Sequence, residues 1–301
     1  MNINQMKYVL TVSNSNSMRE AATKLYISQP ALSSSIMELE NELGILIFER
    51  SNKGIVLTDE GSEFLTYVKK VLGQYEILEE RYLSGDKDKD RFSVSTQHFT
   101  FAIRSFANVV KRFDTEKFVY SIHETKTGEV LEHVRDLKSE VGIVSYSEVN
   151  EKVLKKLLKE YTLEFVPLMI RDTYAYVWKG HPMSGRRKIS LSELQDYPCI
   201  VFDQSDDTNF YLTEEAMADY DFKKLIKSDD RATTMELIAG LNGYSVGSGM
   251  LAESDAILRG MVSIKLKEED PLTIGYITRK GSNLSKYGVA YIEELLKHKE
   301  I

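Results

Sequence analysis

Apolar side chains recur with a helical period in two short segments near the N-terminus, joined by a tight turn. Ser17 precedes the first segment and Ser28 the second, and each can cap a helix by accepting a backbone N–H. Pro30 lies in the first turn of the second helix, where its missing N–H costs little. Ala21 and Ala22 are small enough to let the two helices cross closely. The positions at spacings of 4, 3 and 4 that predict one buried face for the second helix are Leu32, Ile36, Leu39 and Leu43.

The opposite face of the second helix carries short polar groups and one long amide near its N-terminus. Such a helix start suits insertion into the major groove of DNA. The pair therefore predicts a helix-turn-helix, although an ordinary helical hairpin has the same pattern. The positions assigned to DNA contact on this helix are Ser28, Gln29, Pro30, Ser33, Ser34 and Met37.

Two apolar runs after Gly44 flank the polar turn Ser-Asn-Lys-Gly at residues 51–54, which predicts a β-hairpin. A hairpin that directly follows a recognition helix is a wing. We therefore expect Arg50 and Lys53 to touch DNA phosphates, and Thr58 to cap the next helix.

The segment from residue 59 to residue 82 predicts one long helix with apolar positions at alternating spacings of 4 and 3. Leu65 and Leu72 widen this stripe. A heptad pattern on a long helix that belongs to a small domain predicts a partner helix from another chain. Packing against the rest of its own chain would give the same pattern. The polar run 84–91 reads as a linker. The positions assigned to dimerisation are Phe64, Val68, Val71, Tyr75, Leu78 and Tyr82.

From residue 92 the pattern changes to apolar strands that alternate with amphipathic helices, which predicts an α/β domain with parallel strands. A second unit follows the first, and its capping box at Ser190 and Glu193 opens a short helix. The expected strands are 92–95, 118–124, 141–145, 161–170, 173–178, 199–203, 244–246, 262–266 and 273–277. The other expected helices are 99–114, 130–137, 208–219, 231–239 and 284–297.

We expect the last strand and helix to return to the first unit, so that the chain crosses between two lobes twice, near residues 161–166 and 266–271. The expected parts are a winged helix-turn-helix at 1–58, a linker and dimerisation helix at 59–84, a hinge at 85–91 and an effector-binding domain at 92–301. Lobe one would comprise about 92–163 and 268–301, and lobe two about 164–267.

The order and spacing of motifs over roughly the first sixty residues resemble the LysR-type transcriptional regulators. The motifs are Ala21-Ala22, Ser28-Gln29-Pro30-Ala31-Leu32-Ser33, Leu39-Glu40, Leu43-Gly44, Phe48-Glu49-Arg50 and Leu57-Thr58-Asp59-Glu60-Gly61. The resemblance implies a two-lobed, periplasmic-binding-protein-like effector domain, a small-molecule effector, promoter DNA as partner and a homotetramer. It also implies that effector binding rotates domains and changes how paired dimers hold DNA.

Ligands in open α/β sheets settle beyond the carboxyl ends of the strands. Hydroxyls and N–H groups before a helix favour a carboxylate or a similar anion there, which predicts a small polar or anionic metabolite. The resemblance singles out Thr96 and Gln97, although capping helices and filling turns explains many such residues equally well. The positions assigned to the effector are Ser95, Thr96, Gln97, His98, Thr125, Thr127, Tyr146, Gln204, Arg231 and Ser248.

Charge limits how this chain can bind DNA. The net charge is −7, the wrong sign for non-specific attraction to phosphate, and residues 1–58 hold five cations against five anions. Met37 and Glu38 stand where LysR-type relatives often carry basic residues. One copy of the motif should therefore bind DNA poorly, and we expect two or more copies to act together.

The remaining chemistry points away from catalysis. None of the five histidines has a metal-ligand spacing, and no nucleophile elbow, phosphate loop or dinucleotide fingerprint is present, so no enzyme activity and no cofactor are expected. The single Cys199 and the lack of a membrane-length apolar run or signal peptide indicate a cytoplasmic protein, with RNA polymerase a possible partner. A solute-binding protein, or an enzyme with an accessory DNA-binding module, remains as an alternative.

Overall fold

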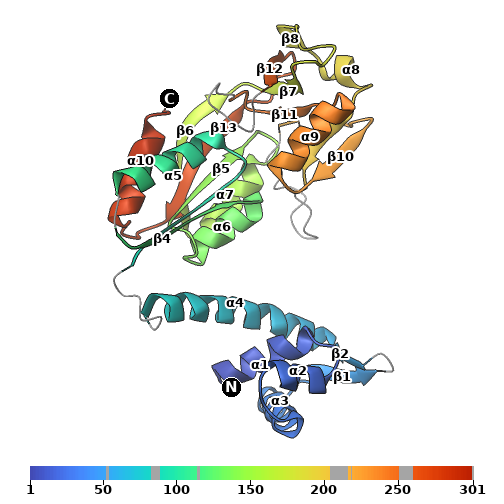
Figure 1. The fold of residues 1–301 in the computed structure, drawn as a ribbon, viewed down its shortest axis with the longest axis vertical. Helices are drawn as coiled ribbons and strands as arrows, with labels where there is room; N and C mark the ends of the chain where they lie inside the picture. Colours follow the sequence, from blue (N-terminus) through green and yellow to red (C-terminus); the bar gives the residue numbers. More distant parts are fainter. Residues whose placement is uncertain are drawn as a thin grey trace. The chain divides into compact units, whose positions relative to one another are not determined.

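A computed structural model describes residues 1–51, 54–82, 89–113, 116–203, 216–217, 219–250 and 260–299. The chain forms two compact units, Met1–Asp88 and Lys89–Ile301 (Figure 1). None of the described helices is long and apolar enough to cross a membrane.

The first unit is a winged helix-turn-helix, as the pattern predicts. The Ser17 hydroxyl accepts from Glu20 N at 3.2 Å, and the Ser28 hydroxyl accepts from Ala31 N at 3.3 Å. Its elements are α1 (Ile3–Ser13), α2 (Met18–Lys24), α3 (Gln29–Leu43), β1 (Phe48–Ser51), β2 (Gly54–Leu57) and α4 (Asp59–Tyr82).

Helix α3 buries one face and is tied to the wing at its far end. Leu32, Ile36 and Leu39 lie in the core beside the alanines of α2. Gly44 ends the helix in the left-handed conformation (φ 70°), which glycine adopts without strain. The Glu40 carboxylate then accepts the backbone N–H groups of residues 47 and 48, at 2.8 and 3.1 Å. These bonds fix where the hairpin leaves the helix.

The first half of α4 packs on the core of its own unit. Leu65, Val68 and Leu72 are buried there, and Val68 is only 1% exposed. Val68 is therefore unavailable to a partner helix, and its assignment to a dimer seam is wrong. The same helix face that would meet a partner is needed to cover the small helix-turn-helix core.

A separate apolar stripe remains uncovered along α4. Tyr67, Val71, Leu78 and Tyr82 are all exposed, and their spacings of 4, 7 and 4 place them on one side of the helix. Tyr75, by contrast, is half-buried with the Lys7 ammonium 5.0 Å from its ring centre. The available surface thus shares Val71, Leu78 and Tyr82 with the predicted seam.

The second unit is built on a five-stranded sheet in the order β4-β3-β5-β13-β6. Strand β3 pairs in parallel with β4 and β5, as predicted, while β13 is antiparallel to both its neighbours. The strands are β3 (Asp90–Thr96), β4 (Phe118–Glu124), β5 (Val141–Tyr146), β6 (Leu163–Arg171) and β13 (Leu272–Arg279). The helices are α5 (Thr100–Arg112), α6 (Thr127–Arg135), α7 (Glu151–Glu160) and α10 (Lys286–Leu296).

Helices cover both faces of this sheet (Figure 1). Val141 and Ile143 of β5 point into the core shared with α5 and α10, whereas Val144 joins the core under α6 and α7. Because successive side chains of a strand point to opposite faces, this distribution explains why β5 is apolar without alternation.

The remaining elements form lobe two around a four-stranded sheet, β11-β7-β12-β8, and a two-stranded sheet, β10-β9. The strands are β7 (Tyr174–Trp178), β8 (Lys188–Ile189), β9 (Cys199–Phe202), β10 (Leu225–Ser228), β11 (Ser245–Gly247) and β12 (Met261–Leu266). The helices are α8 (Leu191–Leu194) and α9 (Arg231–Leu241).

The first crossing between lobes lies later than predicted. Strand β6 was expected to open lobe two, but it pairs with β13 in the first sheet, so the chain crosses at residues 172–173. The second crossing lies at 267–271, between β12 and β13. The two crossings are joined by a 3.0 Å bond from the Thr173 hydroxyl to the Asp270 carbonyl.

Further differences separate the prediction from the structure. Strand β3 begins at Asp90, so residues 90 and 91 belong to the sheet rather than to the hinge. Helix α7 and the short strands β8 and β10 were not predicted. The helix predicted at 208–219 lies mostly outside the described residues.

Candidate DNA-reading face and effector cavity

The N-terminal part of α3 presents an exposed polar surface. Gln29, Pro30 and Ser34 are exposed, and Met37 is 57% exposed although apolar. The Gln29 amide donates to the Ser33 hydroxyl at 2.9 Å, one helical turn away. This pair can exchange its internal bond for bonds to a base edge, which is how an amide reads adenine.

Two features qualify the predicted DNA contacts. The Ser34 hydroxyl donates to the Glu38 carboxylate at 3.2 Å, so an anion lies on the reading face and would repel phosphate. On the wing, Arg50 lies in β1 opposite Ile55. The Arg50 side chain and the whole of Lys53 lie outside the described residues.

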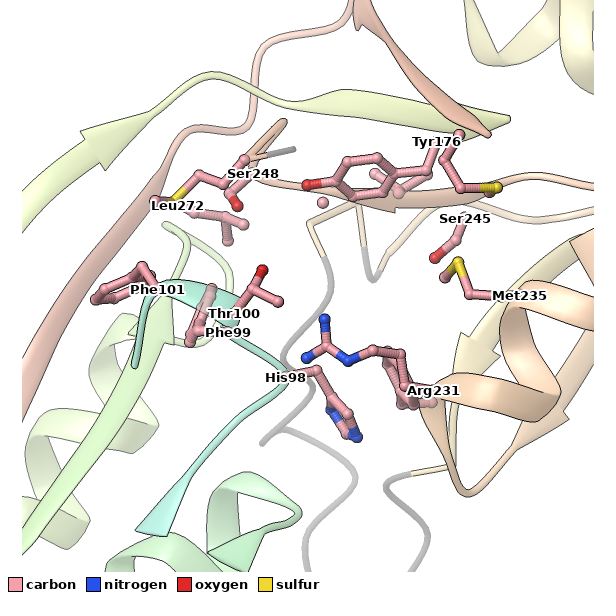
Figure 2. Close-up of a pocket in the computed structure, with 15 residues that line it drawn as sticks. His98, Phe99, Thr100, Phe101, Tyr176, Arg231, Met235, Ser245, Ser248 and Leu272 are labelled. Atoms are coloured by element: carbon pink, nitrogen blue, oxygen red, sulfur yellow. The ribbon is translucent and has the colours of Figure 1, made fainter. Parts of the chain in front are cut away.

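A cavity of about 90 Å³ opens between the two lobes of the second unit (Figure 2). A water needs about 15 Å³ on this measure, so the space holds roughly six waters or a ligand of similar size. The polar lining residues are His98, Thr100, Tyr176, Arg231, Ser245 and Ser248. The apolar lining residues are Phe99, Phe101, Phe202, Met235, Val246, Met250, Met261 and Leu272, and Gly247 adds backbone.

Three of the predicted effector residues line this cavity: His98, Arg231 and Ser248. Gln204 lies outside the described residues. The other six predicted residues do not line it, and most of them are engaged in bonds within lobe one. They are Ser95, Thr96, Gln97, Thr125, Thr127 and Tyr146.

Gln97 is a structural residue and not a cavity residue. Its amide nitrogen donates to the Thr127 hydroxyl at 2.5 Å, and its amide oxygen accepts from Ser145 N at 2.7 Å and from the Ser145 hydroxyl at 3.0 Å. The side chain is fully buried and joins the ends of β3 and β5 to the start of α6. The Thr96 hydroxyl is likewise buried and donates to the Gln97 carbonyl at 2.8 Å. The expectation that these two residues hold the ligand is therefore not met.

Ser95 belongs to a second internal cluster. Its hydroxyl lies 2.8 Å from His133 Nδ1 and 2.7 Å from the Ser139 hydroxyl. Lys138 Nζ lies 3.0 Å from the other ring nitrogen of His133. Burial, followed by the neighbouring Lys138 charge, lowers the His133 pKa to about 4. The imidazole is thus held neutral in this cluster.

The remaining two misplaced residues are also accounted for locally. The Thr125 hydroxyl donates to the Glu129 carboxylate within the first turn of α6. The Tyr146 ring packs on Phe165, with ring centres 5.3 Å apart. Both residues lie at the carboxyl ends of strands, but neither lines the cavity.

The start of α5 supplies a polar group, Thr100, that was not among the predicted effector residues. Phe99 occupies the N-cap position and provides no side-chain cap, and residues 99–101, which include the Thr100 hydroxyl, line the cavity. The signal in the sequence was a helix start without a capping side chain, directly after a strand. Tyr176 and Ser245 also line the cavity and were not predicted, because the sequence of lobe two does not indicate which of its strands faces the cleft.

Two contacts join the lobes across the cavity mouth. Arg231 Nε donates to Glu124 Oε1 at 3.1 Å. The His98 ring stacks on Phe202, with ring centres 3.4 Å apart and planes inclined by 5°. Since Glu124 and His98 come from lobe one and Arg231 and Phe202 from lobe two, these contacts hold the lobes together.

Tyr176 and Ser248 form a hydroxyl pair at the roof of the cavity (Figure 2). Burial raises the pKa of Tyr176, while hydrogen bonds to Ser248 and to the backbone of residues 249 and 250 oppose that shift. The phenol therefore stays neutral and acts as a donor or acceptor. Across the described ranges, no group of three or more His, Cys, Asp or Glu residues could hold a metal ion.

Family models match both units of this chain. The bacterial regulatory helix-turn-helix protein model of the lysR family matches residues 3–62. The LysR substrate binding domain model matches residues 100–300, which is two thirds of the chain. The chain belongs to the LysR family. It is a LysR-type transcriptional regulator, with a helix-turn-helix DNA-binding domain and an effector-binding domain of the LysR type.

Relatives span nearly the whole chain. A hydrogen peroxide-inducible genes activator of Dickeya chrysanthemi is 22% identical over 297 residues, covering 94% of this chain and 91% of the relative. The HTH-type transcriptional regulator SsuR of Burkholderia cenocepacia is 25% identical, covering 99% and 96%. Among solved structures, the LysR family regulator CbnR superposes with a TM-score of 0.65 at 17% identity and 100% coverage of both chains. CbnR has also been solved with its target DNA, and that structure superposes with a TM-score of 0.64 at 16% identity, covering 99% of this chain and 100% of CbnR. At these identities the structural likeness concerns the fold.

Proposed function

We propose that this LysR family member binds promoter DNA with the start of α3 and changes that binding when a small polar or anionic metabolite enters the cavity between its lobes. The observation that carries the proposal is the exposed Gln29–Ser33 pair, which lies at the start of a helix whose opposite face is buried. A polar surface opposite the packed face of a helix is available for base contacts.

The DNA-binding surface works in more than one copy. The five cations of residues 1–58 are matched by five anions, and Glu38 adds a negative charge to the reading face itself. Phosphate contacts from one copy are therefore few. We infer that the exposed stripe of α4 (Tyr67, Val71, Leu78 and Tyr82) joins two chains, and that dimers pair into a tetramer on DNA.

The cavity is suited to a small ligand with one anionic group. Arg231, the Thr100 hydroxyl and the N–H groups at the start of α5 converge on one end, and the rest of the lining is mainly apolar. Of the predicted effector residues we retain His98, Arg231 and Ser248, and we add Thr100, Tyr176 and Ser245.

Ligand binding explains control better than thiol oxidation does, even though one relative is named for hydrogen peroxide. Cys199 is the single cysteine, so the chain cannot form an internal disulfide. The thiol is fully buried at the start of β9, and oxidation needs an accessible thiolate. A regulator of this kind meets promoter DNA and RNA polymerase in the cytoplasm, which is where we place it.

A gel shift with DNA from upstream of its own gene tests the proposed reading helix. Gln29→Ala and Ser33→Ala should each lose at least about fivefold in affinity for that DNA, because each removes a base contact worth about 1–3 kcal/mol. Thr66→Ala on α4 is the matched control, since its hydroxyl donates only to the Ser62 carbonyl of its own helix. Unchanged specificity in both α3 variants would refute the assignment.

A further inference from the structure

The guanidinium of Arg231, the cation that lines the cavity, is already paired with a carboxylate of the opposite lobe. Arg231 Nε donates to Glu124 Oε1 at 3.1 Å, and Nη2 lies 3.1 Å from the same oxygen. Glu124 lies at the end of β4 and Arg231 at the start of α9. One edge of the guanidinium is therefore committed to a carboxylate of the protein itself.

The rest of the guanidinium is left for a ligand. The Arg231 side chain is 10% exposed, and among the described residues its hydrogen bond and ion pair both go to Glu124, through Nε and Nη2. In Figure 2 the guanidinium points from α9 into the cavity, toward Thr100 at the start of α5. An anion that accepts a charge-assisted hydrogen bond from the other edge of this guanidinium would be bound there.

No further permanent cation lines the cavity in the described part of the chain. His98 Nε2 lies 3.7 Å from Glu124 Oε1, so the imidazole is placed beside the same carboxylate that Arg231 contacts. Asp230 adds a second negative charge beside Arg231, and hydrogen bonds from Thr233 lower its pKa, which keeps it ionised. Lys227 is paired with Asp203 at 3.6 Å. The charged groups at the mouth thus leave no surplus of positive charge.

We propose that Glu124 sets the charge of the ligand, so that the cavity accepts a small monocarboxylate with a short apolar tail and rejects dianions. One carboxylate fits the remaining edge of Arg231, the α5 N–H groups and the Thr100 hydroxyl. A second carboxylate would lie among methionine and aromatic side chains with no cation to meet it. This inference rests on the proposed effector role of the cavity.

Butyrate and succinate test the inference, because they share a four-carbon chain and differ by one carboxylate. Binding to the full-length protein is followed by thermal shift and calorimetry. The wild type should be stabilised by butyrate and not by succinate. Glu124→Gln should improve succinate binding relative to butyrate by at least about tenfold, since one opposing charge is removed nearby. Arg231→Gln should lose both ligands.

Glu132→Gln is the matched control, because this acid lies on α6 and pairs with Arg135 at 3.5 Å, away from the cavity. It should keep the wild-type preference. The inference is overturned if succinate stabilises the wild type as strongly as butyrate, if Glu124→Gln leaves the ratio unchanged, or if neither acid stabilises the wild type. Promoter binding of the same preparation in the gel shift is a separate result, so a wrong ligand class is distinguished from a wrong regulator assignment.

Discussion

Polar residues at the ends of strands do not all belong to the ligand cavity. Thr96 and Gln97 stand at the carboxyl end of a parallel strand, where ligands commonly bind, yet both are buried and bonded within lobe one. Arg231, which was predicted because it begins a helix at the cleft, does line the cavity. The difference is geometric: a side chain at a strand end can turn inward to join neighbouring strands or outward to the cleft.

Gln97→Ala should therefore destabilise the protein instead of removing only effector binding. The substitution removes the acceptor of the buried Ser145 N–H and the bond from Gln97 to the Thr127 hydroxyl. We expect a loss of about 2 kcal/mol in the free energy of unfolding, or roughly 4–8 °C in Tm for a unit of this size. The exposed Gln195→Ala is the control and should change Tm by less than about 1 °C. A Gln97→Ala protein with wild-type Tm would contradict the network.

His133 should make stability depend on pH. Its pKa is about 4 in the folded protein, below the value of about 6.5 in an unfolded chain, so the unfolded state binds a proton that the folded state does not. The contribution is present above pH 6.5 and is lost as pH falls toward 4. After allowance for its partial exposure it amounts to about 1–2 kcal/mol. His133→Gln should therefore lower Tm at pH 7.5, with the difference from wild type shrinking at pH 5. An unchanged difference across that range would refute the coupling.

At the scale of elements, periodicity predicted the existence of helices and strands well and their partners less well. The caps at Ser17 and Ser28, the hairpin and the parallel β3, β4 and β5 follow from local patterns. Strand β6 was placed in the wrong lobe, because its pairing with β13 joins segments about a hundred residues apart and nothing in β6 itself encodes it. Helix α7 was missed although Leu154 and Leu158 carry its buried face.

Helix α4 divides into two apolar surfaces with different expected roles. Leu78→Asp should dissociate the oligomer, because Leu78 is 54% exposed on the uncovered stripe, and it should leave the fold of the DNA-binding unit intact. Leu72→Ala should instead destabilise that unit by about 2–4 kcal/mol, since Leu72 is buried in its core. Analytical ultracentrifugation and circular dichroism of both variants separate these effects. An oligomer that survives Leu78→Asp would place the interface elsewhere.

At the scale of the whole molecule, a DNA-binding unit with no surplus of positive charge is combined with a ligand-binding unit in one chain. Paired copies compensate for the weak contacts of each unit, since every copy adds its own base and phosphate contacts. A ligand that binds one arrangement of the lobes better than another then shifts the population of DNA-bound arrangements. The ligand's difference in affinity for the two arrangements is what changes promoter binding.

Footprinting of the DNA upstream of its own gene distinguishes binding by paired copies from binding by one copy. We expect two or more protected segments whose centres are separated by whole turns of DNA, about 10 bp or a multiple of it. Gln29→Ala should remove the protection while leaving Tm unchanged. A footprint that persists in Gln29→Ala, or a single protected segment bound by one copy of the protein, would contradict this expectation.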